Sequence, residues 1–168
     1  MTPMPNTTPM PTVTVRPMTV DEAPVTAALF REVVGSLAIY TEEARAHALA
    51  QKTEAALIER VRDDPYSMLL AWDGDKAVGF MTSRKDDGTL WLSWLGVLPE
   101  YRRHGVGEVL LRAAESTAVH RGMKKAWCDC RTDNHASRAL LTKLGYRIIG
   151  EVTQHWHGQD YYLWDKHL

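Results

Sequence analysis

The stretch of sequence that decides the fold is Val97-Leu98-Pro99-Glu100-Tyr101-Arg102-Arg103-His104-Gly105-Val106-Gly107. It leads from a strand-like segment into a segment with helical spacing. Gly105 and Gly107 place no side chain where the backbone bends, so the first N–H groups of the helix face outward. The helix dipole favours an anion there, and positive charge on the approach comes from Arg102, Arg103 and His104. The stretch predicts a phosphate-binding turn, and a solvated basic loop is the simpler alternative.

Outward from this turn, strand alternation and helical spacing predict an α/β (α+β) domain. Its order is β-α-α-β-β-β-α-β-α-β-β, with about seven strands in a mixed, mainly antiparallel sheet and four helices. The expected strands span 12–16, 67–72, 77–83, 89–97, 124–130, 146–156 and 160–166. The expected helices span about 19–35, 41–62, 106–122 and 134–145.

Composition agrees with a single globular domain. The chain has 168 residues, 45% of them hydrophobic, and we expect the domain to span 12–168 after a disordered Pro/Thr-rich tail at 1–11. A net charge of −1 argues against a nucleic-acid partner, although 89–168 holds 11 Lys and Arg against 8 Asp and Glu. No secretory signal and no long apolar run appear, so we expect no membrane contact. Two cysteines, Cys128 and Cys130, favour a cytoplasmic protein.

The central stretch resembles the acetyl-CoA loop of the GCN5-related N-acetyltransferase (GNAT) family. That loop reads Arg/Gln-x-x-Gly-x-Gly/Ala, and two further family patterns read Val-x-Pro-x-Tyr-Arg and Asn-x-x-Ala/Ser-x-x-Leu-x-x-x-x-Gly-Phe/Tyr. The matching residues are Val97, Pro99, Tyr101, Arg102, Gly105, Gly107, Asn134, Ser137, Leu140, Gly145 and Tyr146. The likeness is close over 89–147, and the order of elements extends it to 12–168.

The resemblance implies acetyl-CoA as co-substrate, with no metal, and an amine acceptor. It places the pyrophosphate on 102–107, Val106 included, and the pantetheine arm between strands 89–97 and 124–130. A backbone N–H near Leu95 to Val97 would hold the oxyanion. Asn134 would reach the pantetheine arm or simply cap a helix. Arg138 and Lys143 would meet the ribose phosphate or only be solvated.

Acetyl transfer needs a neutral amine, and deprotonating an ammonium of pKa about 10 at pH 7 costs about 4 kcal/mol. The resemblance to ribosomal-protein N-terminal acetyltransferases makes Asp129 the base. Alternatively, Asp129 faces solvent or pairs with Arg131 or Lys125. Many family members protonate the thiolate with a tyrosine at the position of Leu141, so water or another tyrosine takes over that role here.

The candidates for this proton donor are Tyr161 and Tyr162, of which only one can point into the site because neighbouring strand residues face opposite ways. Tyr146 matches a family position that usually packs in the core. His155 and His157, expected on one strand face, suggest a base or a metal ligand. The two cysteines suggest buried packing more than a nucleophile. Core packing or an apolar acceptor groove accounts for the tryptophans on the expected strands, Trp91, Trp94, Trp156 and Trp164.

The leading hypothesis is therefore an acetyl-CoA-dependent N-acetyltransferase that acts on a primary amine by direct attack in a ternary complex. A small-molecule acceptor is slightly favoured, because the last two strands are joined by only three residues, 157–159. A protein N-terminal or lysine acetyltransferase, a non-catalytic acyl-CoA-binding module and, more weakly, a nucleic-acid-associated protein are the alternatives. A homodimer is also an open alternative.

Overall fold

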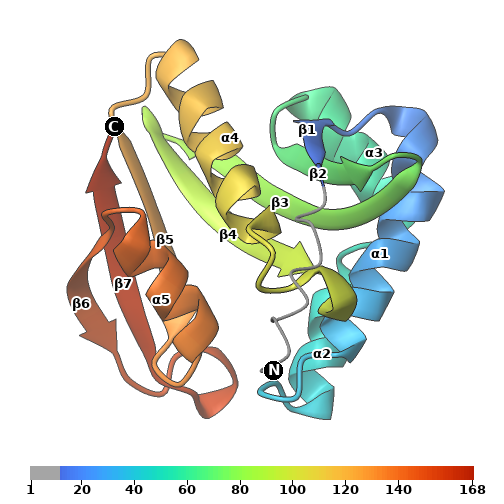
Figure 1. Ribbon diagram of the computed structural model, residues 1–168. Helices are drawn as coiled ribbons and strands as arrows, with labels where there is room; N and C mark the ends of the chain where they lie inside the picture. Colours follow the sequence, from blue (N-terminus) through green and yellow to red (C-terminus); the bar gives the residue numbers. More distant parts are fainter. Residues whose placement is uncertain (1–11) are drawn as a thin grey trace, which may run out of the picture.

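The computed structural model describes residues 12–168, and the expected tail at 1–11 lies outside the described residues (Figure 1). Seven strands form one sheet in the order β1-β2-β3-β4-β5-β7-β6. Neighbouring strands are antiparallel except β4 and β5, which run parallel. The strands are β1 (Thr14–Pro17), β2 (Met68–Asp73), β3 (Lys76–Asp86), β4 (Thr89–Val97), β5 (Lys125–Arg131), β6 (Arg147–Val152) and β7 (Tyr161–His167).

The described part of the chain also holds five α-helices: α1 (Ala23–Gly35), α2 (Glu42–Ala50), α3 (Glu54–Asp63), α4 (Val106–His120) and α5 (His135–Lys143). Single 3-10 turns lie at η1 (Val20–Glu22), η2 (Pro99–Tyr101) and η3 (Trp156–Gly158). The mixed α/β architecture and its mainly antiparallel sheet confirm the expected fold class. Figure 1 shows α4 and α5 over the same side of the sheet.

Two glycines let helices approach the sheet from opposite faces. A Cβ on Gly96 would overlap the Phe80 ring and lie 2.8 Å from Cγ1 of Val33 in α1. A Cβ on Gly79 would lie 3.1 Å from Leu110 in α4. The missing side chains allow α1 to pack on one face of β3 and β4 while α4 packs on the other.

The predicted single helix over 41–62 is wrong, because it is divided into α2 and α3. Helix α2 ends at Ala50, and Thr53 begins a second helix by accepting a hydrogen bond from the Ala56 N–H at 3.3 Å. A Thr-Glu pair inside an amphipathic run is a helix start signal, and here it acts as one.

The predicted strand over 146–156 is also too long. Strand β6 ends at Val152, and Gln154 and His157 adopt left-handed backbone angles, with φ of 48° and 50°. The expectation that His155 and His157 share a strand face is therefore wrong, since both lie in the loop between β6 and β7.

Candidate active site

The parallel strands β4 and β5 are paired at one end and separate at the other. Cα partners are found only at Leu90–Ala126, Trp91–Trp127 and Leu92–Cys128 among the described residues. Directly after Leu92, the register of β4 against β3 shifts by one residue, which leaves Ser93 as an extra residue. Such a bulge bends its strand, and beyond it β4 runs away from β5. A gap therefore opens between the two strands.

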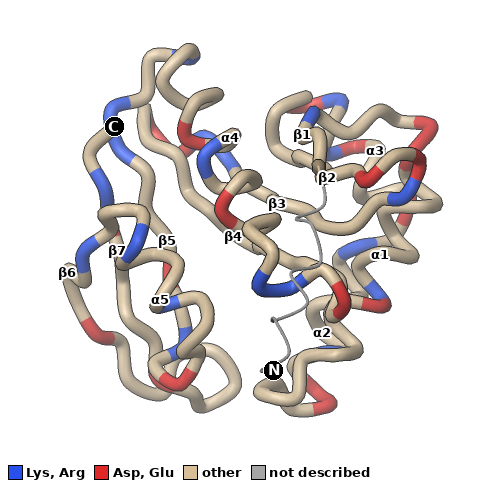
Figure 2. The backbone as a smooth tube through the Cα atoms, in the orientation of Figure 1, with Lys and Arg blue, Asp and Glu red and all other residues tan. Residues whose placement is uncertain are grey.

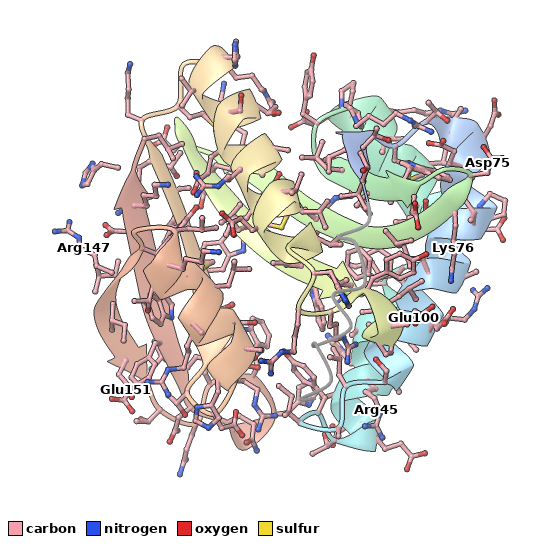
Figure 3. All side chains as sticks on the ribbon, in the orientation of Figure 1. Arg45, Asp75, Lys76, Glu100, Arg147 and Glu151 are labelled. Atoms are coloured by element: carbon pink, nitrogen blue, oxygen red, sulfur yellow. The ribbon has the colours of Figure 1, made fainter. Side chains whose placement is uncertain are left out.

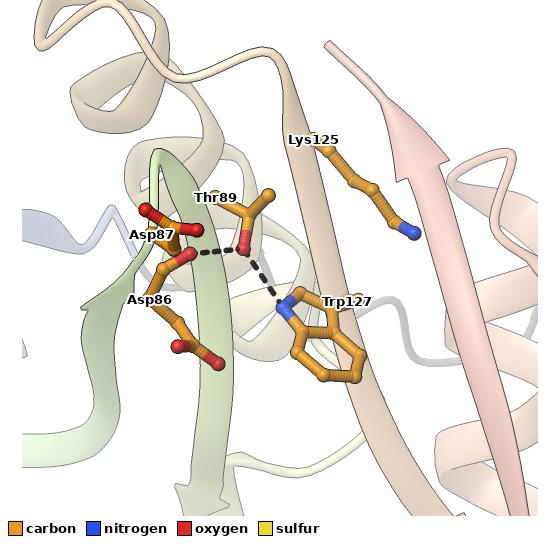
Figure 4. A pocket seen from close by; sticks show the side chains of 5 residues that line it. All are labelled: Asp86, Asp87, Thr89, Lys125 and Trp127. Carbon is orange, nitrogen blue, oxygen red and sulfur yellow. Dashed lines mark hydrogen bonds between the residues drawn. The ribbon is translucent and has the colours of Figure 1, made fainter.

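Side-chain contacts hold the other end of the gap closed (Figure 4). The Thr89 hydroxyl donates to the Asp86 carbonyl at 2.6 Å and accepts from Trp127 Nε1 at 3.0 Å. The rings of Trp91 and Trp127 also meet edge to face, with centroids 4.6 Å apart. A hollow of about 270 Å³ lies here, lined by Asp86, Asp87, Thr89, Lys125 and Trp127. Because it lies at the closed end, it is remote from the glycine turn.

The glycine turn has the geometry of an anion cradle. Gly105 precedes α4 with a left-handed φ of 81°, and the first intrahelical bond runs from the Val109 N–H to the Gly105 carbonyl at 3.1 Å. The N–H groups of Val106, Gly107 and Glu108 therefore have no acceptor within the helix. Figure 2 shows basic residues in the loop that leads into this turn.

The segment before the cradle is anchored to the turn between β2 and β3. The Tyr101 hydroxyl donates to Asp73 at 2.9 Å. Lys76 pairs with Glu100 at 2.9 Å, and Figure 3 labels these two residues. These bonds fix the direction in which the chain enters α4.

Arg102 anchors the loop as well, from the side of α1. Its Nε donates to the Val97 carbonyl at 2.9 Å, and its Nη2 donates to the Ser36 hydroxyl at 2.6 Å. The side chain thus joins the end of β4 to the end of α1. Arg103 is exposed with a φ of 63°, and the Nδ1 atom of the half-buried His104 has no hydrogen-bond partner among the described residues.

An acidic residue in the first turn of α4 is neutralised by two cations. Glu108 contacts Lys143 at 2.6 Å and Arg112 at 3.0 Å, and these cations hold the pKa of Glu108 below its usual range. Lys143, a candidate ligand of the coenzyme, is therefore engaged with α4. The pairing removes a negative charge that would oppose an anion at the cradle.

Helix α5 begins at the residue that the resemblance assigns to the pantetheine arm. The Asn134 side chain accepts from the Ser137 N–H at 3.1 Å, so it acts as the N-cap of α5. Arg138 donates from Nη1 to the Thr132 carbonyl at 2.7 Å and lies over the Tyr162 ring at 5.3 Å. Its Nε is buried without a partner in the described part of the chain. Both residues lie on the α5 side of the gap.

Asp129 lies on β5 beside the open part of the gap. Burial raises the pKa of its carboxyl, and a hydrogen bond from Trp156 Nε1 to Oδ2 at 3.3 Å opposes that shift. His155 Nε2 lies 4.0 Å from the same oxygen. The suggested pairings with Arg131 and Lys125 are not formed, because these cations pair with Asp133 and Asp165 at 2.7 and 3.1 Å.

The two candidate tyrosines face opposite sides of the sheet. Tyr161 is opposite Arg131 on β5, so its side chain lies on the Asp129 face, whereas Tyr162 is opposite Cys130 on the α5 face. Burial and then the nearby Asp129 carboxylate raise the pKa of Tyr161 to about 12. The two tyrosines alternate as expected, so each face of the sheet beside the gap carries one of them.

Sequence reasoning missed Tyr40, which follows α1. Its ring lies 5.8 Å from that of Trp94, and burial followed by the nearby Tyr161 raises the pKa of its hydroxyl. No periodic pattern marks a single tyrosine in a loop, so no sequence signal for it exists.

The role of Arg131 as an organiser of the site was also missed. Its side chain is only 6% exposed, and it donates to Asp133, to Gln159 Oε1 at 3.0 Å and to the Ile39 carbonyl. The guanidinium also lies 5.4 Å from the centroid of the Tyr40 ring. Arg131 thus joins three loops around the Asp129 side of the gap.

The two cysteines and Tyr146 have surroundings that fit a packing role. Cys128 and Cys130 are buried, as expected for packing, and burial raises the pKa of the Cys130 thiol to about 12. Tyr146 is buried as well. Over the described range 12–168, no three His, Cys, Asp or Glu side chains are placed to hold a metal ion. Within the same range, no helix has the length and apolar character needed to cross a bilayer.

The fold and the cradle agree with comparisons to known proteins. The model of the acetyltransferase (GNAT) family matches residues 29–146. An uncharacterized N-acetyltransferase of Mycobacterium tuberculosis is 29% identical over 105 residues, which cover 62% of this chain and 67% of that protein. The solved structure of a GCN5-related N-acetyltransferase from Rhodopseudomonas palustris is 27% identical with a TM-score of 0.76, covering 95% of this chain and 98% of that one.

A further likeness concerns the fold alone. The PaiA N-acetyltransferase of Thermoplasma acidophilum, solved in complex with coenzyme A, superimposes with a TM-score of 0.80 at 16% identity, covering 94% of this chain and 99% of that one. The family match spans well over half of the sequence and includes the glycine turn. The chain therefore belongs to the GNAT family of acetyltransferases, whose co-substrate is acetyl-CoA.

Proposed function

We propose that the protein transfers the acetyl group of acetyl-CoA to the primary amine of a small molecule, by direct attack in a ternary complex. The observation that carries the proposal is the alignment of the Gly105 cradle with a gap that opens between β4 and β5. The cradle would bind the pyrophosphate, and the gap would admit the pantetheine arm from the α5 side. The similarity to a fold solved with coenzyme A supports this arrangement.

The residues present fit such a co-substrate. The first turn of α4 offers unpaired N–H groups, and Glu108 beside it is already neutralised by Lys143. Asn134 and Arg138 lie at the start of α5, and the buried Nε of Arg138 has no acceptor within the described residues. Arg102 acts on the loop conformation, through Val97, rather than as a direct phosphate ligand.

Asp129 is the proposed base. Its carboxylate lies on the face opposite α5, so the acceptor would arrive from the side away from the coenzyme. The raised pKa of this carboxyl makes it a better proton acceptor than an exposed aspartate. Once the amine is neutral, it can attack the thioester through the gap, while a backbone N–H between Leu95 and Val97 supports the oxyanion.

The two tyrosines of β7 would have different roles. Tyr162, on the α5 face, is the proposed proton donor to the departing thiolate. It would take the role of the α5 tyrosine that many family members have at the position of Leu141. Tyr161, beside Asp129, would contact the acceptor. A cytoplasmic location, favoured by two cysteines that form no disulfide, belongs to the same proposal.

The test combines binding and turnover. We expect calorimetry to detect coenzyme A binding, and mass spectrometry of pooled amines incubated with acetyl-CoA to detect a product heavier by about 42 Da. Asp129→Asn should shift the onset of turnover to higher pH, because the reaction then depends on amine that is already neutral. Asp87→Asn, in the exposed turn at the closed end of the gap, is the matched control.

Three results would overturn the proposal or one of its parts. Binding of acetyl-CoA without acetylation of any amine would favour the non-catalytic acyl-CoA-binding module. Turnover with protein N-termini or lysines alone would replace the small-molecule acceptor with a protein. An unchanged pH profile for Asp129→Asn would remove Asp129 from the role of base.

A further inference from the structure

Aromatic side chains flank the gap on the face that carries Asp129. On one side, the rings of Trp94 and Tyr40 lie 5.8 Å apart. On the other side, the His155 ring lies 5.0 Å from that of Trp156 and 5.7 Å from that of Tyr161. These two groups come from β4 and the loop after α1 on one side, and from β7 and the loop before it on the other.

A carboxylate lies among these rings. Trp156 Nε1 donates to Asp129 Oδ2 at 3.3 Å, and His155 Nε2 lies 4.0 Å from the same atom. The indole is therefore held edge-on to the proposed base. The residue as a whole remains 53% exposed, so the indole is held at its Nε1 atom and still offers surface to a ligand.

The loop that presents Trp156 has an unfavourable backbone. Gln154 and His157 have left-handed φ angles without being glycine, and they flank the Trp156 position on both sides. The loop is kept in this shape by bonds from the Gln154 N–H to Asp160 and from the His155 N–H to the Gln159 carbonyl, both 2.8 Å. Backbone strain of this kind persists mainly at functional sites.

The two aromatic groups are also tied together. Arg131 donates to the Ile39 carbonyl, next to Tyr40, and to Gln159 in the loop of Trp156. A buried guanidinium with this many acceptors is rigid, so the spacing between the two groups is fixed before any ligand arrives.

We propose that Trp156 determines acceptor specificity, and that the acceptor is a primary amine attached by a short linker to an aromatic or other flat apolar group. The inference rests on the proposed function. The ring of the acceptor would pack on the exposed part of Trp156, on the face of the sheet that also carries Trp94. Its ammonium would then lie at Asp129, whose carboxylate attracts the cation.

The experiment compares three alkylamines, 2-phenylethylamine, 2-cyclohexylethylamine and n-hexylamine, with a short peptide that has a free N-terminal alanine. The α-amine of the peptide is a weaker base, with a pKa of about 8, so its kcat/KM is compared after correction for the neutral fraction. We expect kcat/KM for 2-phenylethylamine to exceed that for n-hexylamine by about tenfold, the range of an aromatic pair contact. Trp156→Leu should abolish most of this preference through KM, whereas loss of the hydrogen bond to Asp129 should affect all the amines alike. Trp156→Phe keeps a ring and should retain the preference.

Trp91→Leu is the matched control, because Trp91 packs on Trp127 at the closed end of the gap. It should leave the preference unchanged. Equal efficiency with n-hexylamine, or a preference untouched by Trp156→Leu, would refute the inference while leaving the acetyltransferase function intact. A preference for the peptide would refute it in favour of a protein acceptor. Failure to acetylate any amine would instead overturn the proposed function.

Discussion

Replacing Gly105 by alanine tests the cradle directly. Gly105 has a φ of 81°, and an L-residue in the left-handed region costs about 1–2 kcal/mol. Gly107, two residues later, is the matched control: an added Cβ would lie 3.4 Å from Leu140 Cδ2 and 3.7 Å from Leu95 Cδ2, which is ordinary packing. Removing the extra backbone freedom of a glycine stabilises a compatible site by about 0.4–1 kcal/mol. The two variants should therefore differ in stability by roughly 2 kcal/mol, with opposite signs.

Urea unfolding measures this difference, and calorimetry with coenzyme A measures its functional consequence. Gly105→Ala should weaken binding, because relief of the strained φ rotates the N–H groups at the start of α4 away from the bound pyrophosphate. Gly107→Ala should bind coenzyme A within about twofold of the wild type, since the added Cβ would make only ordinary van der Waals contacts with Leu140 and Leu95. Equal affinity and equal stability for the two variants would refute the assignment of the cradle to the left-handed turn.

Other predictions test the packing and the buried acid. Gly96→Ala should destabilise the fold by about 1–3 kcal/mol in urea, since its Cβ overlaps Phe80, and a neutral effect would contradict the close packing of α1. Burial raises the pKa of Asp129 in the folded protein above its value in the unfolded chain. The folded state is therefore favoured while the carboxyl is protonated, below about pH 4, and loses this stabilisation as the carboxyl ionises at higher pH. Asp129→Asn should therefore gain stability over the wild type between about pH 4 and pH 7, and a loss there would contradict the raised pKa. Cys128 and Cys130 should resist iodoacetamide until the protein is unfolded, and rapid labelling of the folded protein at about pH 8 would contradict their burial.

The fold class and the cradle could be predicted because they depend on local patterns. The turn at Gly105 combines glycine spacing, a preceding strand and a following apolar helix, and each of these is visible within about fifteen residues. The division of the 41–62 helix was missed although Thr53 is a good N-cap, because the apolar spacing continues across it. At Gly105 the local sequence signals agree with the folded structure. At Thr53 the apolar spacing predicts one helix, whereas the structure has two.

The acceptor side could be predicted only in part. Asp129 is a candidate base through the resemblance to ribosomal-protein N-terminal acetyltransferases, and an apolar acceptor groove is one explanation of the tryptophans. The contact of Trp156 with Asp129 depends instead on a loop whose left-handed residues, Gln154 and His157, carry no glycine signal. Tyr40 and Arg131 meet across 91 positions of chain, a separation at which periodicity carries no information. Their meeting is a property of the folded sheet.

The bulge at Ser93 shows why alternation alone misplaces one wall of the site. In a regular strand from Thr89 to Val97, Trp91 and Trp94 would point to opposite faces, since side chains alternate with period two. The shift of register at Ser93 reverses the faces of all later residues, so Trp94 lies on the same face as Trp91 and contacts Tyr40. The same extra residue ends the pairing with β5 directly after Leu92. One inserted residue thus opens the gap and turns an aromatic side chain toward the acceptor side, so deleting Ser93 should close the gap and displace Trp94 together.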